Sequence, residues 1–211
     1  LHGLAQVDLL DARLVVEAPI DDKTRFLVAG RRSHVDAWIG GVMEAGGAVG
    51  VRTAPRYYDY QAIVERDLGS RTTARLALLG SDDALALTLN SAGRDLAASG
   101  GLDTATRFWR VQGRVDTRIN ERIRWINTLS YGSDMQRFSL GNNFAFRVNQ
   151  NPLTARSDLR AKISDHLTAI AGIDTVWTQI NASVKAPPIP EDGEATGPAF
   201  ARQSNRQTFD G

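Results

Sequence analysis

The 211-residue sequence contains no cysteine, which excludes disulfides, thiolate metal sites and thiol catalysis. It has only three histidines, at positions 2, 34 and 166. No run of about 18 apolar residues occurs, so we expect no transmembrane helix. The formal net charge is only +1, which argues against a nucleic-acid partner. No metal constellation, catalytic triad or cofactor loop is visible, so we expect no cofactor and no enzyme activity.

What the sequence does contain is a recurring alternation of apolar and polar residues, the period of half-buried β-strands. A helix would instead bring residues three or four positions apart onto one face. The clearest segment places Leu153, Leu159 and Ile163 opposite Arg156 and Asp158. Seven segments alternate in this way: 11–18, 57–65, 73–78, 109–116, 123–131, 153–163 and 167–174. The predicted fold class is therefore all-β.

The connections between these segments alternate in length. Tight turns are expected at 19–22, 69–70, 120–121 and 164–166. Longer polar or Gly-rich segments lie between them, roughly at 33–53, 81–104 and 132–151, with a last one from about 185. Short turns at one end and long loops at the other are typical of outer-membrane barrels, whereas soluble sandwiches have modest loops at both ends. This pattern predicts an antiparallel, up-and-down transmembrane β-barrel with short periplasmic turns and long extracellular loops.

Aromatic residues on the apolar face are distributed as a lipid interface would place them. Five aromatic residues fall near the long-loop ends: Tyr58, Tyr60, Trp109, Tyr131 and Trp177. A sixth, Trp125, falls near a short-turn end. Aromatic bands bordering an apolar belt are typical of the membrane interface. The alternative is that these rings fill the core of a soluble sandwich. Asn127 is a defect in the membrane interpretation, because an amide on a lipid-facing belt is unfavourable.

The opposite face carries charged residues that are compatible with a solvated interior. We expect them to form ladders of ion pairs, which would satisfy charges in a confined space. The residues that we place there are Asp59, Glu65, Arg110, Arg114, Asp116, Arg156, Asp158 and Arg160. An anion-selective channel is a functional alternative, but the near-neutral charge balance disfavours it.

Six short motifs follow one another in a consistent order and spacing. They are VDLLDA at 7–12, EAPI at 17–20, KTRF at 23–26, AGRRSHVD at 29–36, APRYYDYQ at 54–61 and LGSDD at 79–83. Together they resemble the early barrel strands of TonB-dependent outer-membrane receptors from GC-rich, myxobacteria-like genomes. The resemblance covers about residues 1–186.

This resemblance implies a bacterial outer-membrane protein that takes up a scarce ligand, such as a siderophore, cobalamin or a glycan. It implies lipid, a plug domain and the inner-membrane TonB complex as partners. The sequence starts at Leu1 without a leader and contains no Ton box, plug or terminal aromatic residue. We therefore expect residues 1–186 to supply eight strands of a larger barrel, with a ninth short one at 4–10. The Pro- and Gly-rich residues 187–211 are expected to form a flexible extracellular loop.

Two local motifs have competing interpretations. Asp82 and Asp83 could contribute carboxylates to a Ca²⁺ site, although a solvated acidic loop tip is the favoured interpretation. The Gly-rich residues 40–50 lack the frames of phosphate-binding loops, so we expect a loop there, with a short helix over 34–43.

Two further interpretations of the whole chain stay open. One is a self-contained small outer-membrane barrel of 8–10 strands with an adhesive or structural role. The other is a soluble β-barrel or sandwich that binds a ligand.

Overall fold

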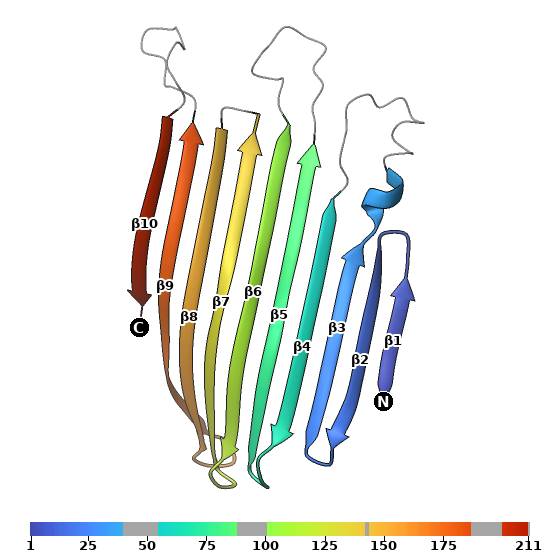
Figure 1. Cartoon of the computed structure of the whole chain (residues 1–211). Coiled ribbons are helices and arrows are strands. Elements are labelled where there is room, and N and C mark those ends of the chain that lie inside the picture. Colours follow the sequence, from blue (N-terminus) through green and yellow to red (C-terminus); the bar gives the residue numbers. More distant parts are fainter. Residues whose placement is uncertain (40–54, 88–100, 142–143, 187–199, 211) are drawn as a thin grey trace, which may run out of the picture.

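The computed structural model describes residues 1–39, 55–87, 101–141, 144–186 and 200–210. These residues form one antiparallel sheet of ten strands, in which each strand pairs with the next along the chain (Figure 1). The all-β meander expected from the sequence is confirmed. The strands are β1 (His2–Val7), β2 (Asp11–Asp21), β3 (Thr24–Ser33), β4 (Arg56–Asp67), β5 (Thr72–Leu87), β6 (Leu102–Arg118), β7 (Ile123–Leu140), β8 (Phe144–Lys162), β9 (Thr168–Ala186) and β10 (Phe200–Asp210).

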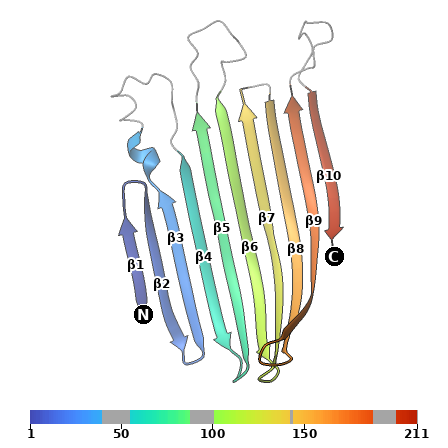
Figure 2. The ribbon, with the colours of Figure 1, turned by 180° about the vertical axis from the view of Figure 1, so that it is seen from behind.

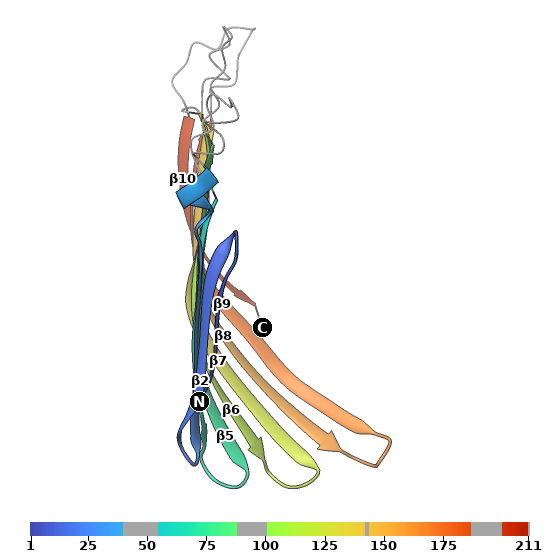
Figure 3. The same ribbon diagram turned by 90° about the vertical axis from the view of Figure 1, so that its right-hand side faces the viewer.

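The sheet is open, with β1 and β10 as its two edges (Figure 2). The described residues therefore do not close into the barrel that the sequence pattern predicts. Seen edge-on, the sheet is twisted: near the short connections, β6 to β9 curve away from the plane of the other strands (Figure 3). Twist and curvature of this kind follow from the right-handed twist of each strand.

Four tight connections lie together at one end of the sheet (Figure 1). They span residues 22–23, 68–71, 119–122 and 163–167. The last three confirm the predicted turns at 69–70, 120–121 and 164–166, whereas most of the turn predicted at 19–22 belongs to β2, which continues to Asp21 with a local register shift. The Leu68 N–H donates to the Thr72 carbonyl at 2.9 Å and closes the second turn. In the third turn the Asn120 side-chain oxygen accepts from the N–H groups of Arg122 and Ile123, at 2.9 and 2.8 Å. Such side-chain-to-backbone bonds explain why Asn favours turns.

At the opposite end the sequence overestimates the loops. Residues 132–151 are not a long loop, because β7 continues to Leu140 and β8 begins at Phe144. Similarly, β5 runs to Leu87 and β6 begins at Leu102, well inside the predicted loop at 81–104. These strands extend beyond the apolar part of the sheet, into a region where polar residues occupy both faces. There the alternation disappears, while the backbone hydrogen bonds of the ladder continue.

The C-terminal prediction is also wrong for residues 200–210. They form β10, which pairs with residues 176–186 of β9, so this part of 187–211 is not a loop. The sequence of β10, FARQSNRQTFD, contains no regular alternation of apolar and polar residues. Its strand is defined by backbone pairing, a signal that hydropathy does not carry. Residues 187–199 and 211 lie outside the described residues.

A short helical turn follows β3 at residues 35–39. It confirms the first half of the helix expected at 34–43; the rest lies outside the described residues. The Trp38 indole N–H donates to the Leu9 carbonyl at 3.1 Å, which ties this turn to the β1–β2 connection. No helix among the described residues is long and apolar enough to cross a membrane.

Candidate functional site

The sheet has two chemically different faces because successive side chains of a strand point to opposite sides. Cross-strand pairing fixes which residues share a face: Val64, Leu76, Gly113, Leu129, Ala155 and Thr175 form one continuous row across β4 to β9. We call the face that carries this row the apolar face and the other the polar face. The apolar and polar sets expected from the sequence lie on these two faces as predicted.

The apolar face is the exposed one. Leu76, Leu129 and Ile173 leave 56%, 57% and 70% of their surface accessible. In contrast, the buried residues Ala77 and Ile126 lie on the polar face, at 4% and 6% exposure. A soluble sheet with one solvated face buries its apolar side and exposes its polar side. In the described strands this order is reversed, so the apolar face has no covering layer.

Charged residues border the apolar face at its two ends. Toward the long connections the charges of β4 to β9 include two pairs: Arg107 Nη2 lies 2.6 Å from Asp82, and Arg137 Nη2 lies 3.0 Å from Asp103. At the short-turn end, Arg66 Nη1 lies 3.1 Å from an Asp21 oxygen. The apolar face therefore carries an uncharged band that is bordered by charges toward the long connections and, toward the short turns, by the Arg66–Asp21 pair between β2 and β4.

The six predicted aromatic residues all lie on the apolar face. Five of them occupy three neighbouring cross-strand rows toward the long-connection end: Tyr58, Tyr60, Trp109, Tyr131 and Trp177. The Trp109 and Tyr131 rings meet edge to face, with centroids 5.8 Å apart, a favourable geometry for aromatic pairs. Trp125 precedes Tyr131 on β7 and lies toward the short turns. Tyr58, Tyr60 and Trp109 thus lie toward the long-connection border of the uncharged band and Trp125 toward the short turns, whereas Tyr131 and Trp177 lie one row from Leu129.

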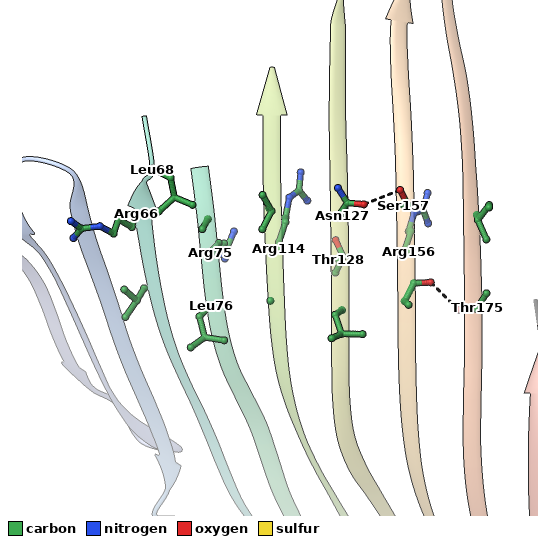
Figure 4. Close-up of a pocket in the computed structure, with 17 residues that line it drawn as sticks. Arg66, Leu68, Arg75, Leu76, Arg114, Asn127, Thr128, Arg156, Ser157 and Thr175 are labelled. Carbon is green, nitrogen blue, oxygen red and sulfur yellow. Dashed lines mark hydrogen bonds between the residues drawn. The ribbon is translucent and has the colours of Figure 1, made fainter. Parts of the chain in front are cut away.

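The structure explains how the apolar face accommodates Asn127. The Ser157 hydroxyl donates to Asn127 Oδ1 at 2.8 Å, and the Trp125 indole N–H donates to the same hydroxyl at 2.9 Å. Figure 4 shows Asn127 and Ser157 facing one another across β7 and β8. They lie in a shallow hollow of about 770 Å³, where Gly113 and Ala155 contribute little side-chain volume. The amide is part of a hydrogen-bonded chain that ends at an aromatic residue near the short-turn border.

The eight charged residues predicted for one face do share the polar face. Two of the expected ion pairs form there: Arg114 Nη2 lies 3.4 Å from Asp116, and Arg156 Nε lies 2.8 Å from Asp158. The others pair differently. Glu65 pairs with Arg25, Asp59 with Arg31 at 3.7 Å, Asp116 also with Arg124 at 2.5 Å, and Arg110 with Asp134 at 2.7 Å.

Glycines on neighbouring strands make room for two of these side chains. A Cβ at Gly132 would lie 2.6 Å from Arg110 Cδ, and a Cβ at Gly172 would lie 2.5 Å from Asp158 Oδ1. Each charged side chain therefore lies across the backbone of the next strand. No buried side-chain nitrogen or oxygen among the described residues lacks a hydrogen-bond partner, as expected for buried polar groups.

Sequence reasoning missed one well-ordered cluster on the polar face. Asp11 is 7% exposed and accepts from Arg31 Nε and Nη2 at 2.9 and 2.7 Å and from the Tyr57 hydroxyl at 2.8 Å. The Arg31 guanidinium also lies 4.6 Å from the Tyr57 ring centroid. All three residues occur in the six resemblance motifs, but their convergence depends on the pairing of β2, β3 and β4.

Asp82 and Asp83 are placed in β5, not in a loop tip. As neighbours in a strand they point to opposite faces. Asp82 pairs with Arg107, and Asp83 accepts from the Ser81 hydroxyl at 3.2 Å. The two carboxylates do not converge on one ion. The described residues contain no group of three or more His, Asp or Glu side chains that could hold a metal.

Comparisons with protein-family models, with curated proteins and with solved structures find no match for this chain.

Proposed function

We propose that this chain forms part of an outer-membrane β-barrel related to TonB-dependent receptors, with its apolar face against lipid. The observation that supports the proposal is the reversed exposure of the sheet, in which Leu76 and Leu129 are accessible while Ala77 and Ile126, on the charged face, are buried. Exposed apolar patches of this extent mark a protein or membrane contact. Lipid is the favoured occupant because aromatic residues and charged borders flank the uncharged band.

The height of the band agrees with a bilayer. On β7 the uncharged part of the apolar face extends from Ile123 to Met135. Within it, one stretch runs from Trp125, the aromatic residue of this strand nearest the short turns, to Met135. At ~3.3 Å per residue this stretch is about 33 Å long, which corresponds to about 25 Å of membrane for a strand tilted by ~40°. Transmembrane barrels present an apolar band of about that height.

On this proposal the polar face lines the interior of the barrel, where Arg–carboxylate pairs are tolerated because water or a plug covers them. The role is uptake rather than catalysis, and the ligand class suggested by the resemblance is a siderophore, cobalamin or a glycan. A plug domain and the TonB complex would be the partners. A lipid environment leaves no water to satisfy free strand edges, so the edges at β1 and β10 must also be paired in the membrane.

Tryptophan quenching by brominated lipid tests the lipid-facing orientation. The chain has four tryptophans, of which Trp109, Trp125 and Trp177 lie on the apolar face and Trp38 lies in the helical turn. Each is kept in turn while the other three are changed to Phe, and the protein is refolded into vesicles. We expect bromine near the headgroups to quench Trp109 and Trp125 more than bromine at the chain ends does, because both lie toward a border. Trp177, one row from Leu129, should be quenched more strongly than these two by bromine deeper in the chains. Trp38 is the internal control and should be quenched little.

A monodisperse, folded chain in detergent-free buffer, with no lipid quenching at any of the three positions, would contradict the proposal. That result would favour a soluble ligand-binding β-protein. Heat-modifiable migration in detergent gels provides an independent readout of barrel formation, and its absence would also count against a membrane barrel.

A further inference from the structure

The polar face has an uneven distribution of positive charge. Toward the long connections two arginines of this face have acidic partners: Arg31 binds Asp11, and Arg110 binds Asp134, both at 2.7 Å. Toward the short turns, a polar hollow of about 650 Å³ lies among β4, β5, β6 and β7 and is lined by five arginines and three acidic residues. The lining residues therefore carry a formal charge of +2, from five positive and three negative side chains.

The acidic residues of this hollow are already engaged. Asp116 binds Arg124 at 2.5 Å and Arg114 at 3.4 Å. Glu65 binds Arg25, which lies outside the hollow. Asp67 Oδ1 accepts from the Thr73 hydroxyl at 2.9 Å. The acids thus leave positive charge in the hollow uncompensated.

Arg75 and Arg118 are the two residues that carry this excess. Within the part of the chain that the structure describes, neither guanidinium has a hydrogen bond or an ion pair. Arg75 lies opposite Glu65 on one side and Arg114 on the other, and Glu65 is already bound to Arg25. Arg118 lies directly opposite Arg124. Like charges directly opposite one another destabilise a sheet, so the two arginine–arginine pairs are unfavourable in the chain alone.

We propose that this hollow binds a small multivalent oxyanion, a molecule with two or more carboxylate or phosphate groups, through Arg75 and Arg118. Planar guanidinium groups match such oxygens in bidentate geometry. Arg114 and Arg124, held by Asp116, complete the positive wall of the site. The proposal needs only the described polar face, so it stands or fails independently of the membrane proposal.

Citrate is the probe, with acetate at equal ionic strength as the monovalent control. The full chain is titrated calorimetrically in detergent micelles, or in buffer if circular dichroism shows it folded there. We expect saturable binding of one citrate per chain and no saturable binding of acetate. The variant R75Q/R118Q should bind citrate at least about tenfold more weakly, because charge-assisted hydrogen bonds are lost.

The matched control is R13Q/R137Q, which removes the same charge from residues bonded elsewhere, to Gln6 and Asp103. It should bind citrate as the unmodified chain does, and R75K/R118K should retain saturable binding. Absence of saturable citrate binding by the unmodified chain would overturn the proposal. An equal loss in both Gln variants would overturn it too, because the effect would then reflect total charge and not this site.

Discussion

The two faces of the sheet obtain their stability in different ways. On the polar face, ion pairs such as Arg110–Asp134 connect neighbouring strands, and residues such as Ala77 and Ile126 are buried. On the apolar face, side chains such as Leu129 and Ile173 remain largely exposed. The difference shows that most charges of the polar face find partners within the chain, whereas the side chains of the apolar face have no covering layer among the described residues; we propose that lipid covers them.

The strongest test of this contrast is an arginine at the centre of the apolar face. Leu129 lies near the middle of the uncharged band of β7 and is 57% exposed. In a bilayer, Leu129→Arg should cost about 2–4 kcal/mol of unfolding free energy, as for charges at the midplane of a barrel wall. Denaturant unfolding in lipid vesicles measures this loss.

The control for that variant is Gln61→Arg, on the polar face beside Asp59. It should change the unfolding free energy by less than about 0.5 kcal/mol, as is usual for accommodating surface substitutions. If Leu129→Arg is equally neutral in vesicles, the apolar face does not contact lipid and the comparison between the faces fails.

A second test concerns Gly80, a position of the apolar face where neighbouring residues of the sheet leave no room for a side chain. A Cβ at Gly80 would lie 2.5 Å from Tyr60 Cζ and 2.7 Å from the Phe108 carbonyl oxygen. Gly80→Ala should therefore cost about 1–3 kcal/mol, because the aromatic ring and a neighbouring strand must move.

Gly113, on the same face, is the matched control for Gly80. A Cβ there would meet no atom within 4 Å, so Gly113→Ala should be neutral or stabilise by up to about 1 kcal/mol through the unfolded chain. Equal losses at both glycines, measured by the same unfolding curves, would show that the Tyr60 ring is not what restricts position 80.

The comparison of faces also explains what could be predicted from the sequence. The alternation of apolar and polar residues predicted strands such as β8 and β9 and the face on which their side chains lie. It could do so because, within the uncharged band, one face of each strand is apolar and the other is polar. The extension of β7 through residues 132–140, and all of β10, went unpredicted because polar residues occupy both faces there.

Partner choice on the polar face could not be predicted for a related reason. An ion pair between strands depends on register, and Glu65 meets Arg25 through the pairing of β3 with β4. Asp134, the partner of Arg110, fell within a segment predicted to be a loop. The sequence therefore identified the charged residues of this face more reliably than their connections.

The smallest expected effect concerns these connections. Asp116 accepts from two arginines, and its side chain is only 16% exposed. Asp116→Asn should cost about 1–2 kcal/mol of unfolding free energy, because two guanidinium groups lose their charge-assisted partner. The control is Asp165→Asn in the last short turn, where the carboxylate is 85% exposed and pairs with Lys162 at 2.7 Å. Exposed pairs of that kind contribute about 0–1 kcal/mol, so the control should lie near zero. Thermal or denaturant unfolding of both variants in one medium decides the matter: losses of equal size would mean that the ion pairs of the polar face stabilise the sheet no more than a surface pair does.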